Sequence, residues 1–364
     1  MEHYDIAVIG AGPAGANFAR LADSIRNRIL VIDDDKQKKP CGGLLSPDAQ
    51  KVLASYDISL PISVLTSPQI FAVRVLDLDN GLTRRYPRHY LNMDRAAFDD
   101  LLRSLIPNTV TVIRGRCASL ADTGNGFLIR LADGKEYAAD RLVGADGANS
   151  LVRRTFFPEK KHSFFTAIQE TSPAQSMNPF YSCIFDSEIS PAPSWLLFKN
   201  GVMIFGGAFS PEGCRHSFEK QKQKLVEYGM IPPDSLFLLD KTEACFLRVS
   251  GFSGFQTGND RIFLIGEAAG FLSPSSFEGI SYALRSGDIL AHTIDMKKPS
   301  RAYRKKTASL RHILQCKECK RRILASPFWR RLILLSGITA IKADTKADNE
   351  FRISFSKKNR NKIR

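Results

Sequence analysis

The chain has few tryptophans and no long apolar run. Two of its 364 residues are Trp, and the longest apolar stretch, residues 332–341, is about half the length that a membrane-spanning helix needs. No charged segment followed by an apolar one precedes the first strand-like residues, so we expect no secretory signal and a cytoplasmic location. A hydrophobic content of 43% is typical of a globular protein with a sizeable core.

The cysteines form neither a disulfide pattern nor a metal-binding pattern. There are seven, an odd and scattered set, and without an export signal such a set favours free thiols. Only Cys316 and Cys319 have the CxxC spacing of metal ligands, and a single CxxC without a second pair is weak evidence for zinc. We therefore predict no metal site.

The positive charge is confined to one end of the chain. The formal net charge is +15, but residues 297–364 contain 21 Lys and Arg against 4 Asp and Glu, whereas the other residues contain 31 against 33. Because the body is nearly neutral, the basic excess is a local feature of the tail. We expect no nucleic-acid partner.

The first 33 residues predict a βαβ unit with a nucleotide-binding turn. Residues 5–9 and 28–32 are expected to be strands and residues 16–25 a helix, with a GxGxxG turn after the first strand. The first glycine allows the sharp turn, the second lets the backbone approach a pyrophosphate, and the third allows close helix packing. An acidic residue after the second strand can accept hydrogen bonds from ribose hydroxyls. The candidate dinucleotide contacts are Gly10, Gly12, Pro13, Ala14, Gly15 and Asp33.

The rest of the body alternates dinucleotide-type and sheet-type segments. Residues 164–209 are aromatic and β-prone with Pro and Gly between them, which predicts an antiparallel sheet. A helix is expected at residues 279–293, and Asp133-Gly134 is a typical hairpin turn. Further strands are expected at residues 70–76, 127–131, 136–143 and 262–265.

Two further segments favour a flavin over a nicotinamide cofactor. GADGANS at residues 144–150 and RIFLIGEAAG at residues 261–270 resemble the DG and GDAA motifs of FAD enzymes of the para-hydroxybenzoate hydroxylase type. The resemblance implies an acidic side chain directed at the ribityl hydroxyls and a helix N-terminus directed at the flavin pyrimidine edge. The FAD contacts that it implies are Arg95, Asp146, Gly266, Glu267, Gly279 and Ile280.

Within this superfamily, KPCGGLLSP at residues 39–47 resembles the PCGG segment of the geranylgeranyl reductase branch. The resemblance extends over about residues 1–290 and places Cys41 and Gly42 beside the flavin. Cys41 is a candidate catalytic thiol, and the alternative is a small buried cysteine. The segments PQIF (68–71), FYSCIFD (180–186), FLIGEAAGF (263–271) and EGISYAL (278–284) closely resemble the enterobacterial flavoproteins of colicin M tolerance.

The chain departs from the branch at the flavin loop and in the substrate segment. Glu267 stands where Asp is usual, and Phe277 stands where a glycine usually precedes the Glu-Gly pair. Of the YxWxFP substrate motif only the tryptophan is present, because Pro193 replaces the Tyr and residues 197–198 are Leu-Phe. We assign to the substrate side Tyr181, Trp195 and Phe277.

No second GxGxxG unit exists in the sequence, so we expect electrons to come from transiently bound NADPH or another external donor, such as a separate reductase or ferredoxin. The WxWxIP signature of flavin-dependent halogenases is also missing. The first absence favours an FAD that an external donor reduces, and the second argues against halogenation.

The tail alternates basic clusters with apolar residues at helical spacing. Phe328 and Trp329 precede Arg330 and Arg331, a combination that suits the boundary of an anionic membrane. The alternative is that these helices pack on the body with a solvated basic face. If the tail binds lipid, the location would be peripheral on the inner face of the cytoplasmic membrane.

The sequence thus predicts an α/β fold with α+β insertions: a Rossmann-type FAD-binding fold, an antiparallel-sheet substrate domain and a helical C-terminal region. The FAD-binding domain would comprise residues 1–55, 90–160 and 250–296, the substrate domain 56–89 and 161–249, the basic helical region 297–341 and a disordered tail 342–364. We expect an FAD-dependent reductase of double bonds in an isoprenoid or other apolar lipid. The alternatives are a flavin monooxygenase acting on an aromatic or apolar compound and a flavin-stabilised, membrane-associated binding protein.

Overall fold

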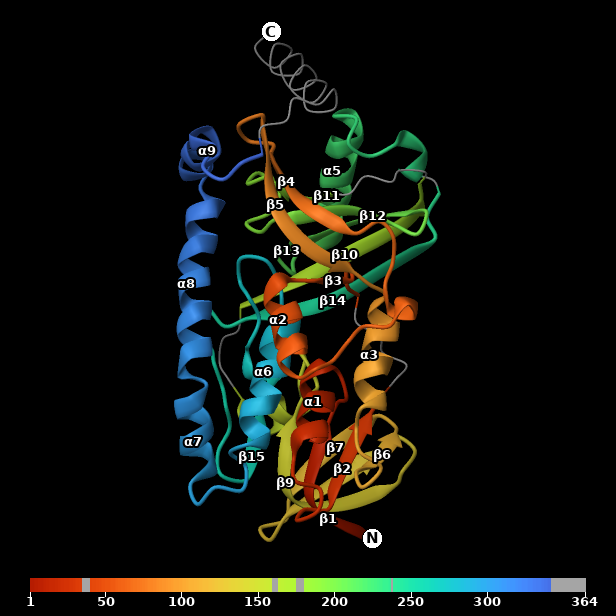
Figure 1. The fold of residues 1–364 in the computed structure, drawn as a ribbon, viewed down its shortest axis with the longest axis vertical. Helices are drawn as coiled ribbons and strands as arrows, with labels where there is room; N and C mark the ends of the chain where they lie inside the picture. Colours follow the sequence, from red (N-terminus) through yellow and green to blue (C-terminus); the bar gives the residue numbers. More distant parts are fainter. Residues whose placement is uncertain (35–39, 159–162, 175–179, 237, 342–364) are drawn as a thin grey trace.

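The computed structural model describes residues 1–34, 40–158, 163–174, 180–236 and 238–341. The chain forms two β-sheets, one toward each end of an elongated molecule, and its C-terminal helices run along one side of both (Figure 1). The prediction of a disordered tail at residues 342–364 lies outside the described residues, as does residue 39 of the PCGG segment.

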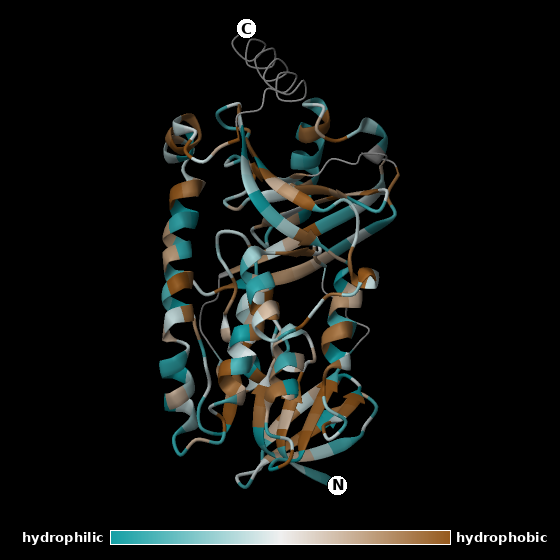
Figure 2. Ribbon diagram, viewed as in Figure 1, coloured by the Kyte–Doolittle hydropathy of each residue, from teal (hydrophilic) through white to brown (hydrophobic). Residues whose placement is uncertain are grey.

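The first sheet is parallel at its centre and has an antiparallel edge. The parallel pairs are β1 with β2, β1 with β9, β2 with β6 and β9 with β15. At the edge, β8 pairs antiparallel with β7 on one side and with β9 on the other. The central strands consist of continuous apolar runs, which are mostly brown in Figure 2, because both of their faces are buried. The strands are β1 (Glu2–Ile9), β2 (Ile29–Asp33), β6 (Thr111–Arg114), β7 (Cys117–Asp122), β8 (Phe127–Leu131), β9 (Glu136–Gly144) and β15 (Ile262–Leu264).

Helix α1 (Pro13–Leu21) begins and ends earlier than the expected residues 16–25. Pro13 occupies the first helical turn, where its fixed φ suits a helix and its missing N–H costs nothing. After the helix, the Asp23 carboxylate accepts hydrogen bonds from two following backbone amides, which favours a turn over a continued helix. The expected helix boundary at residue 25 is therefore wrong.

Helix α6 (Ile280–Ala291) packs directly on α1. A Cβ added at Gly287 would lie 2.5 Å from the Ala14 carbonyl oxygen, so only glycine allows this approach. Asn17 Nδ2 donates to the Leu284 carbonyl at 2.7 Å and fixes the register of the two helices. Because both helices begin at the carboxyl ends of the parallel strands, their N-termini face the same space between the sheets.

The second sheet has the order β14-β10-β13-β12-β11-β4-β5-β3 and is antiparallel except where β11 pairs in parallel with β4. Its strands are β3 (Leu44–Leu45), β4 (Ile70–Asp77), β5 (Leu82–Asn92), β10 (Ser163–Pro173), β11 (Phe180–Phe185), β12 (Ser194–Lys199), β13 (Val202–Phe209) and β14 (Lys241–Val249). One face packs on α5 (Cys214–Glu227) through the buried Phe218 and Leu225. The other helical elements are α2 (Pro47–Ser55), α3 (Arg95–Ser104), α4 (Leu151–Phe156), η1 (Ile62–Val64), η2 (Pro233–Leu236) and η3 (Gly266–Ala269).

The C-terminal helices are α7 (Pro299–Lys306), α8 (Ala308–Ala325) and α9 (Pro327–Ser336). The Tyr303 hydroxyl donates to the Leu264 carbonyl at 3.0 Å, and Leu310 and Leu314 are buried in the core. These helices are an integral layer of the fold. Among the residues that the structure describes, no helix has both the length and the apolar character needed to cross a membrane.

Candidate active site

A cavity of about 1870 Å³ lies between the two sheets and is lined by residues of both. It begins at the glycine turn between β1 and α1, passes the second-sheet residues Gln169 and Trp195, and reaches Lys317 in α8 and Ile333 in α9. The cavity therefore joins the predicted dinucleotide site to the predicted substrate site.

The three glycines of the turn have different structural roles. Gly10 has a left-handed backbone (φ +100°), and a Cβ added there would lie 2.7 Å from the Ala145 carbonyl oxygen. A Cβ at Gly15 would overlap the Gly10 carbonyl oxygen, whereas a Cβ at Gly12 meets no atom within 4 Å. Gly10 and Gly15 are needed for the fold itself, and Gly12 leaves open space at the N-terminus of α1, where the helix dipole favours a phosphate.

Asp33 lies at the end of β2 and holds the glycine turn. Its Oδ1 accepts a hydrogen bond from the Ala11 amide at 2.7 Å, and its Oδ2 lies 3.4 Å from Arg103 Nη1. The carboxylate also lines the cavity, which is the position that ribose binding requires.

Asp146 of the DG segment presents a carboxyl oxygen to the same cavity. Its Oδ2 accepts from the amides of Leu151 and Val152 at 2.6 and 3.2 Å, while its buried Oδ1 has no hydrogen-bond partner among the described residues. Burial raises the pKa of this carboxyl above its ordinary value, although the surrounding donors oppose the shift. A carboxyl oxygen without a partner is a hydrogen-bond acceptor, so on the same cavity it fits a hydroxyl group of FAD.

Most of the predicted FAD contacts meet at this cavity. Those that line it are Gly10, Gly12, Pro13, Ala14, Asp33, Cys41, Gly42, Arg95, Asp146, Glu267, Gly279 and Ile280. Gly15 and Gly266 do not line it. Gly266 has φ +56° and donates its amide to Ser286 Oγ at 2.9 Å, so its role lies in backbone packing.

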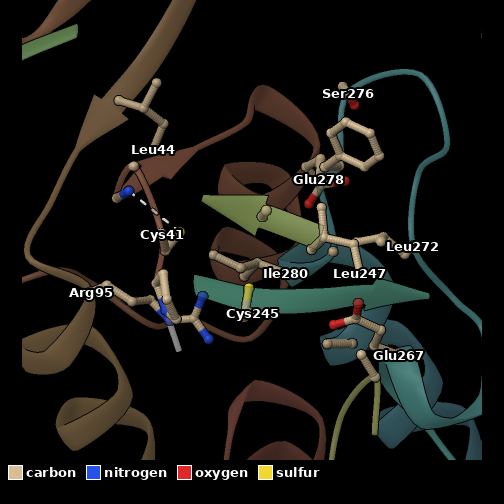
Figure 3. Close-up of a pocket in the computed structure, with 18 of the residues that line it drawn as sticks. Cys41, Leu44, Arg95, Cys245, Leu247, Glu267, Leu272, Ser276, Glu278 and Ile280 are labelled. Carbon is tan, nitrogen blue, oxygen red and sulfur yellow. Dashed lines mark hydrogen bonds between the residues drawn. The ribbon is translucent and has the colours of Figure 1, made fainter. Parts of the chain in front are cut away.

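Two glutamates lie on one side of the cavity, opposite Cys41 and Arg95 (Figure 3). Glu267 Oε1 accepts from the Arg248 amide at 3.1 Å. Glu278 accepts from the amide and the hydroxyl of Ser281, both at 2.8 Å, and thereby caps the N-terminus of α6. Burial raises the pKa of Glu278, against these hydrogen bonds.

Cys41 lies beside two cations. Its Sγ accepts a hydrogen bond from the Gly43 amide at 3.4 Å, and Arg95, which pairs with Asp99 at 2.9 Å, lies next to it (Figure 3). Burial raises the pKa of the thiol, but the charge of Arg95, the Gly43 amide and Lys199 together outweigh burial, and the net pKa is lowered. Such a thiol has more thiolate character near neutral pH than an ordinary cysteine.

Lys199 was not singled out from the sequence. Its Nζ donates to the Met93 carbonyl at 2.8 Å, and burial lowers its pKa to about 8, opposed by Cys41 and Asp94. The residue ends strand β12 and looks like an ordinary strand lysine in the sequence. Its importance follows from partners that lie about a hundred positions earlier, and only the folded chain brings them together.

The predicted substrate residues line the part of the cavity next to the second sheet. Trp195 Nε1 donates to Gln169 Oε1 at 3.3 Å, and Gly206 leaves room for the indole, since a Cβ there would lie 2.5 Å from the ring. The Tyr181 ring lies 5.8 Å from that of Tyr90, and burial raises its pKa.

Phe277 has a left-handed backbone, φ +52°, which favours the glycine usual at this position in the enzymes that the loop resembles. Its ring packs edge-on against Phe165 at 5.7 Å. The departure at Phe277 therefore places an aromatic contact between this loop and strand β10 of the second sheet.

Comparisons with known proteins agree with this geometry. Protein CbrA of Escherichia coli is 41% identical over 357 residues, which cover 94% of this chain and 99% of the relative. A geranylgeranyl bacteriochlorophyll reductase-like protein of Thermoplasma acidophilum has a TM-score of 0.75 at 17% identity, over 96% of each chain. PqsL, a probable FAD-dependent monooxygenase of Pseudomonas aeruginosa, has a TM-score of 0.69 at 17% identity, over 93% of this chain and all of the other. No family model matches the chain.

The mixed α/β architecture predicted from the sequence is confirmed, and the fold is similar to those of the reductase-like and monooxygenase proteins named above. The structural neighbours show the fold alone, because they are below 25% identity and include both reductase-like and monooxygenase proteins. The sequence relatives are more specific, since their identity extends over nearly the whole chain. The chain belongs to the CbrA family.

Proposed function

We propose that the protein is an FAD-dependent reductase that saturates a double bond in an isoprenoid or other apolar lipid, and that NADPH or another external donor supplies the electrons. The observation that carries this proposal is the single cavity that joins the FAD contacts to an aromatic wall through Cys41 and Lys199. The likeness to a geranylgeranyl bacteriochlorophyll reductase-like fold supports the reaction class as an analogy.

FAD, when bound and reduced, supplies a hydride to one carbon of the double bond. The other carbon needs a proton, and we assign its donation to the Cys41 thiol, since its pKa is lowered toward neutral pH. Arg95 and Lys199 then stabilise the thiolate, which regains its proton from solvent. Lys199, with a pKa of about 8, is largely protonated near neutral pH and can serve as the proton relay.

The remaining lining residues position the substrate. Tyr181, Trp195 and Phe277 offer apolar surface that holds a hydrocarbon chain and excludes water from the reacting carbons. The ring packing of Phe277 on Phe165 and the hydrogen bond of Trp195 to Gln169 fix two of these walls. A rigid apolar wall selects a lipid by shape more than by polar groups.

The test uses reduced holoprotein without oxygen, mixed with a polyprenyl alcohol dispersed in detergent. The expected result is reoxidation of the flavin at a rate that depends on lipid, with product heavier by two hydrogens. In D2O both new hydrogens should be deuterium, because the N–H of reduced flavin that provides the hydride exchanges with solvent. Cys41→Ser should slow reoxidation by about 100-fold, the lower end of the contribution of a general acid. Cys214→Ser, at the start of α5 and outside the cavity, is the matched control.

The monooxygenase alternative rests on the fold shared with PqsL. It requires oxygen in the product, so labelled dioxygen separates the two reactions: label in the lipid would overturn the reductase proposal. A flavin that is reduced but never reoxidised by any lipid or by aromatic compounds would favour the binding-protein alternative.

A further inference from the structure

Helix α9 exposes apolar side chains on its outer side. Phe328, Trp329, Leu332 and Leu335 are 63, 54, 47 and 51% exposed. The inner side carries Leu334 and Arg330, both buried against the body. A helix on the surface of a protein in water normally turns its apolar residues inward, so an outward apolar side indicates an environment other than water.

The inner side of α9 is anchored by an ion pair. Arg330 is 1% exposed, and its Nε and Nη2 each lie 2.9 Å from the Asp77 carboxylate of β4, which is fully buried. Arg330 also pairs with Asp79, and its guanidinium stacks on Phe185 at 4.9 Å. The anchor holds the apolar side outward, so the exposed residues are not the result of a loosely attached helix.

The cavity reaches the surface beside this helix. Ile333 of α9 and Ile338 just after it both line the cavity and are 42 and 73% exposed, so they stand at its mouth. Lys320 of α8 lines the same end. The cavity thus extends from the predicted substrate site to the surface beside α9, where apolar Leu324, Ile333 and Ile338 line it together with Lys320.

The C-terminal helical region, of which α9 is the last helix, is strongly basic. Residues 297–341 contain thirteen Lys and Arg and one acidic residue, Glu318, a net charge of +12. Glu318 is paired with Arg321 at 2.7 Å and Arg322 at 3.0 Å, while Lys320 and Arg331 are exposed. Exposed apolar residues with basic flanks are complementary to an anionic lipid surface.

We propose that the α9 surface, made of Phe328, Trp329, Arg331, Leu332 and Leu335, docks on an anionic lipid membrane and places the cavity mouth against the lipid. An apolar substrate then enters the cavity past Ile333 and Ile338 without crossing water. This inference rests on the proposed function for its substrate, and on the geometry of α9 alone for the docking.

The first test is co-sedimentation of the full-length holoprotein with vesicles of phosphatidylglycerol and phosphatidylcholine at low salt. Wild-type protein should bind, and binding should weaken as salt screens the basic residues. Trp329→Ser with Leu332→Ser and Leu335→Ser should weaken binding by about 100-fold, since burying the exposed half of each such side chain contributes about fivefold. Ile25→Ser with Ile62→Ser, at highly exposed positions away from α9, should bind like wild type.

Depth of insertion gives an independent readout. The chain has two tryptophans, so Trp195→Phe leaves Trp329 as the only reporter. Its emission should shift to shorter wavelength on anionic vesicles and be quenched by brominated lipid. No vesicle binding at low salt, or binding without a shift, would overturn the proposal. So would a concentration-dependent dimer that the α9 variant abolishes, or binding that appears only after residues 342–364 are removed.

A comparison of substrate formats separates this inference from the proposed function. The α9 triple variant should reduce detergent-dispersed lipid like wild type and lose at least tenfold on lipid embedded in vesicles. Equal loss in both formats would overturn the entry route. If no lipid is reduced in either format while vesicle binding and the Trp329 shift persist, the reductase proposal fails and the docking surface stands.

Discussion

Replacing Gly12 by valine should remove FAD and leave the fold intact. Gly12 has φ −66° and ψ −174°, a conformation that any residue adopts, and its Cβ direction meets no atom within 4 Å. The free energy of unfolding of the apoprotein should therefore change by less than about 1 kcal/mol. The added side chain would occupy the space of the pyrophosphate at the start of α1.

The size of the FAD defect follows from the hydrogen bonds that the phosphate would lose. A bond from a backbone amide to a charged group contributes about 1.5–3 kcal/mol, and displacement from two amides of α1 costs about 3–6 kcal/mol. The dissociation constant should rise by about 100- to 10,000-fold. The assay is titration of apoprotein with FAD by flavin fluorescence, with urea unfolding of the same samples.

Gly15→Val is the matched comparison, because its Cβ would overlap the Gly10 carbonyl oxygen. This variant should lose both stability and FAD, whereas Gly12→Val should lose FAD alone. If Gly12→Val binds FAD as tightly as wild type, the cavity at α1 is not the pyrophosphate site and the assignment of the glycine turn is wrong.

Three further predictions concern the buried ion pair of Arg330, the Cys41 thiol and the packing of Trp195. Arg330→Met leaves the buried Asp77 without its ion-pair partner and should lower the free energy of unfolding, measured with urea, by about 3–5 kcal/mol. Arg330→Met combined with Asp77→Asn should recover most of this loss. Equal losses in the two variants would contradict the ion-pair account. The alkylation rate of Cys41, followed by mass spectrometry of its peptide, should reach half its maximum at a pH below the pKa of an ordinary thiol. Lys199→Met should move this midpoint to higher pH. An unchanged midpoint would show that Lys199 does not act on Cys41. Gly206→Val should displace the Trp195 indole and impair lipid turnover with FAD binding retained, and normal turnover would place the substrate elsewhere.

The first sheet could be predicted closely because its signals are local. The glycine turn, the strand at residues 127–131 and the hairpin at Asp133-Gly134 are each defined by neighbouring residues, and the structure has them in these places. The parallel pairing of β11 with β4 could not be predicted, since it joins segments about a hundred residues apart. Strand composition indicates that a segment is β-prone but not which partner it selects.

In the tail, too, the sequence does not indicate which basic residues are buried in ion pairs. Arg330 and Arg331 are adjacent and identical in the sequence, yet one is buried in an ion pair and the other is exposed. The acidic partner of Arg330 lies in β4, some 250 positions earlier, so the basic cluster alone could not separate an anchor from a membrane contact. The role of Lys199 could not be predicted either, because its partners Met93 and Cys41 lie far from it in the sequence.

The C-terminal helices act as a mechanical strap across the two halves of the molecule. Tyr303 ties the strap to β15 of the first sheet, and Arg330 ties it to β4 of the second, on the same side of the cavity. A strap fixed at both ends resists a hinge motion that would swing the sheets apart on that side. Substrate entry would then depend on local movement of side chains at the cavity mouth. Substitutions at Ile333 and Ile338 would change the rate of substrate exchange more than substitutions between the sheets.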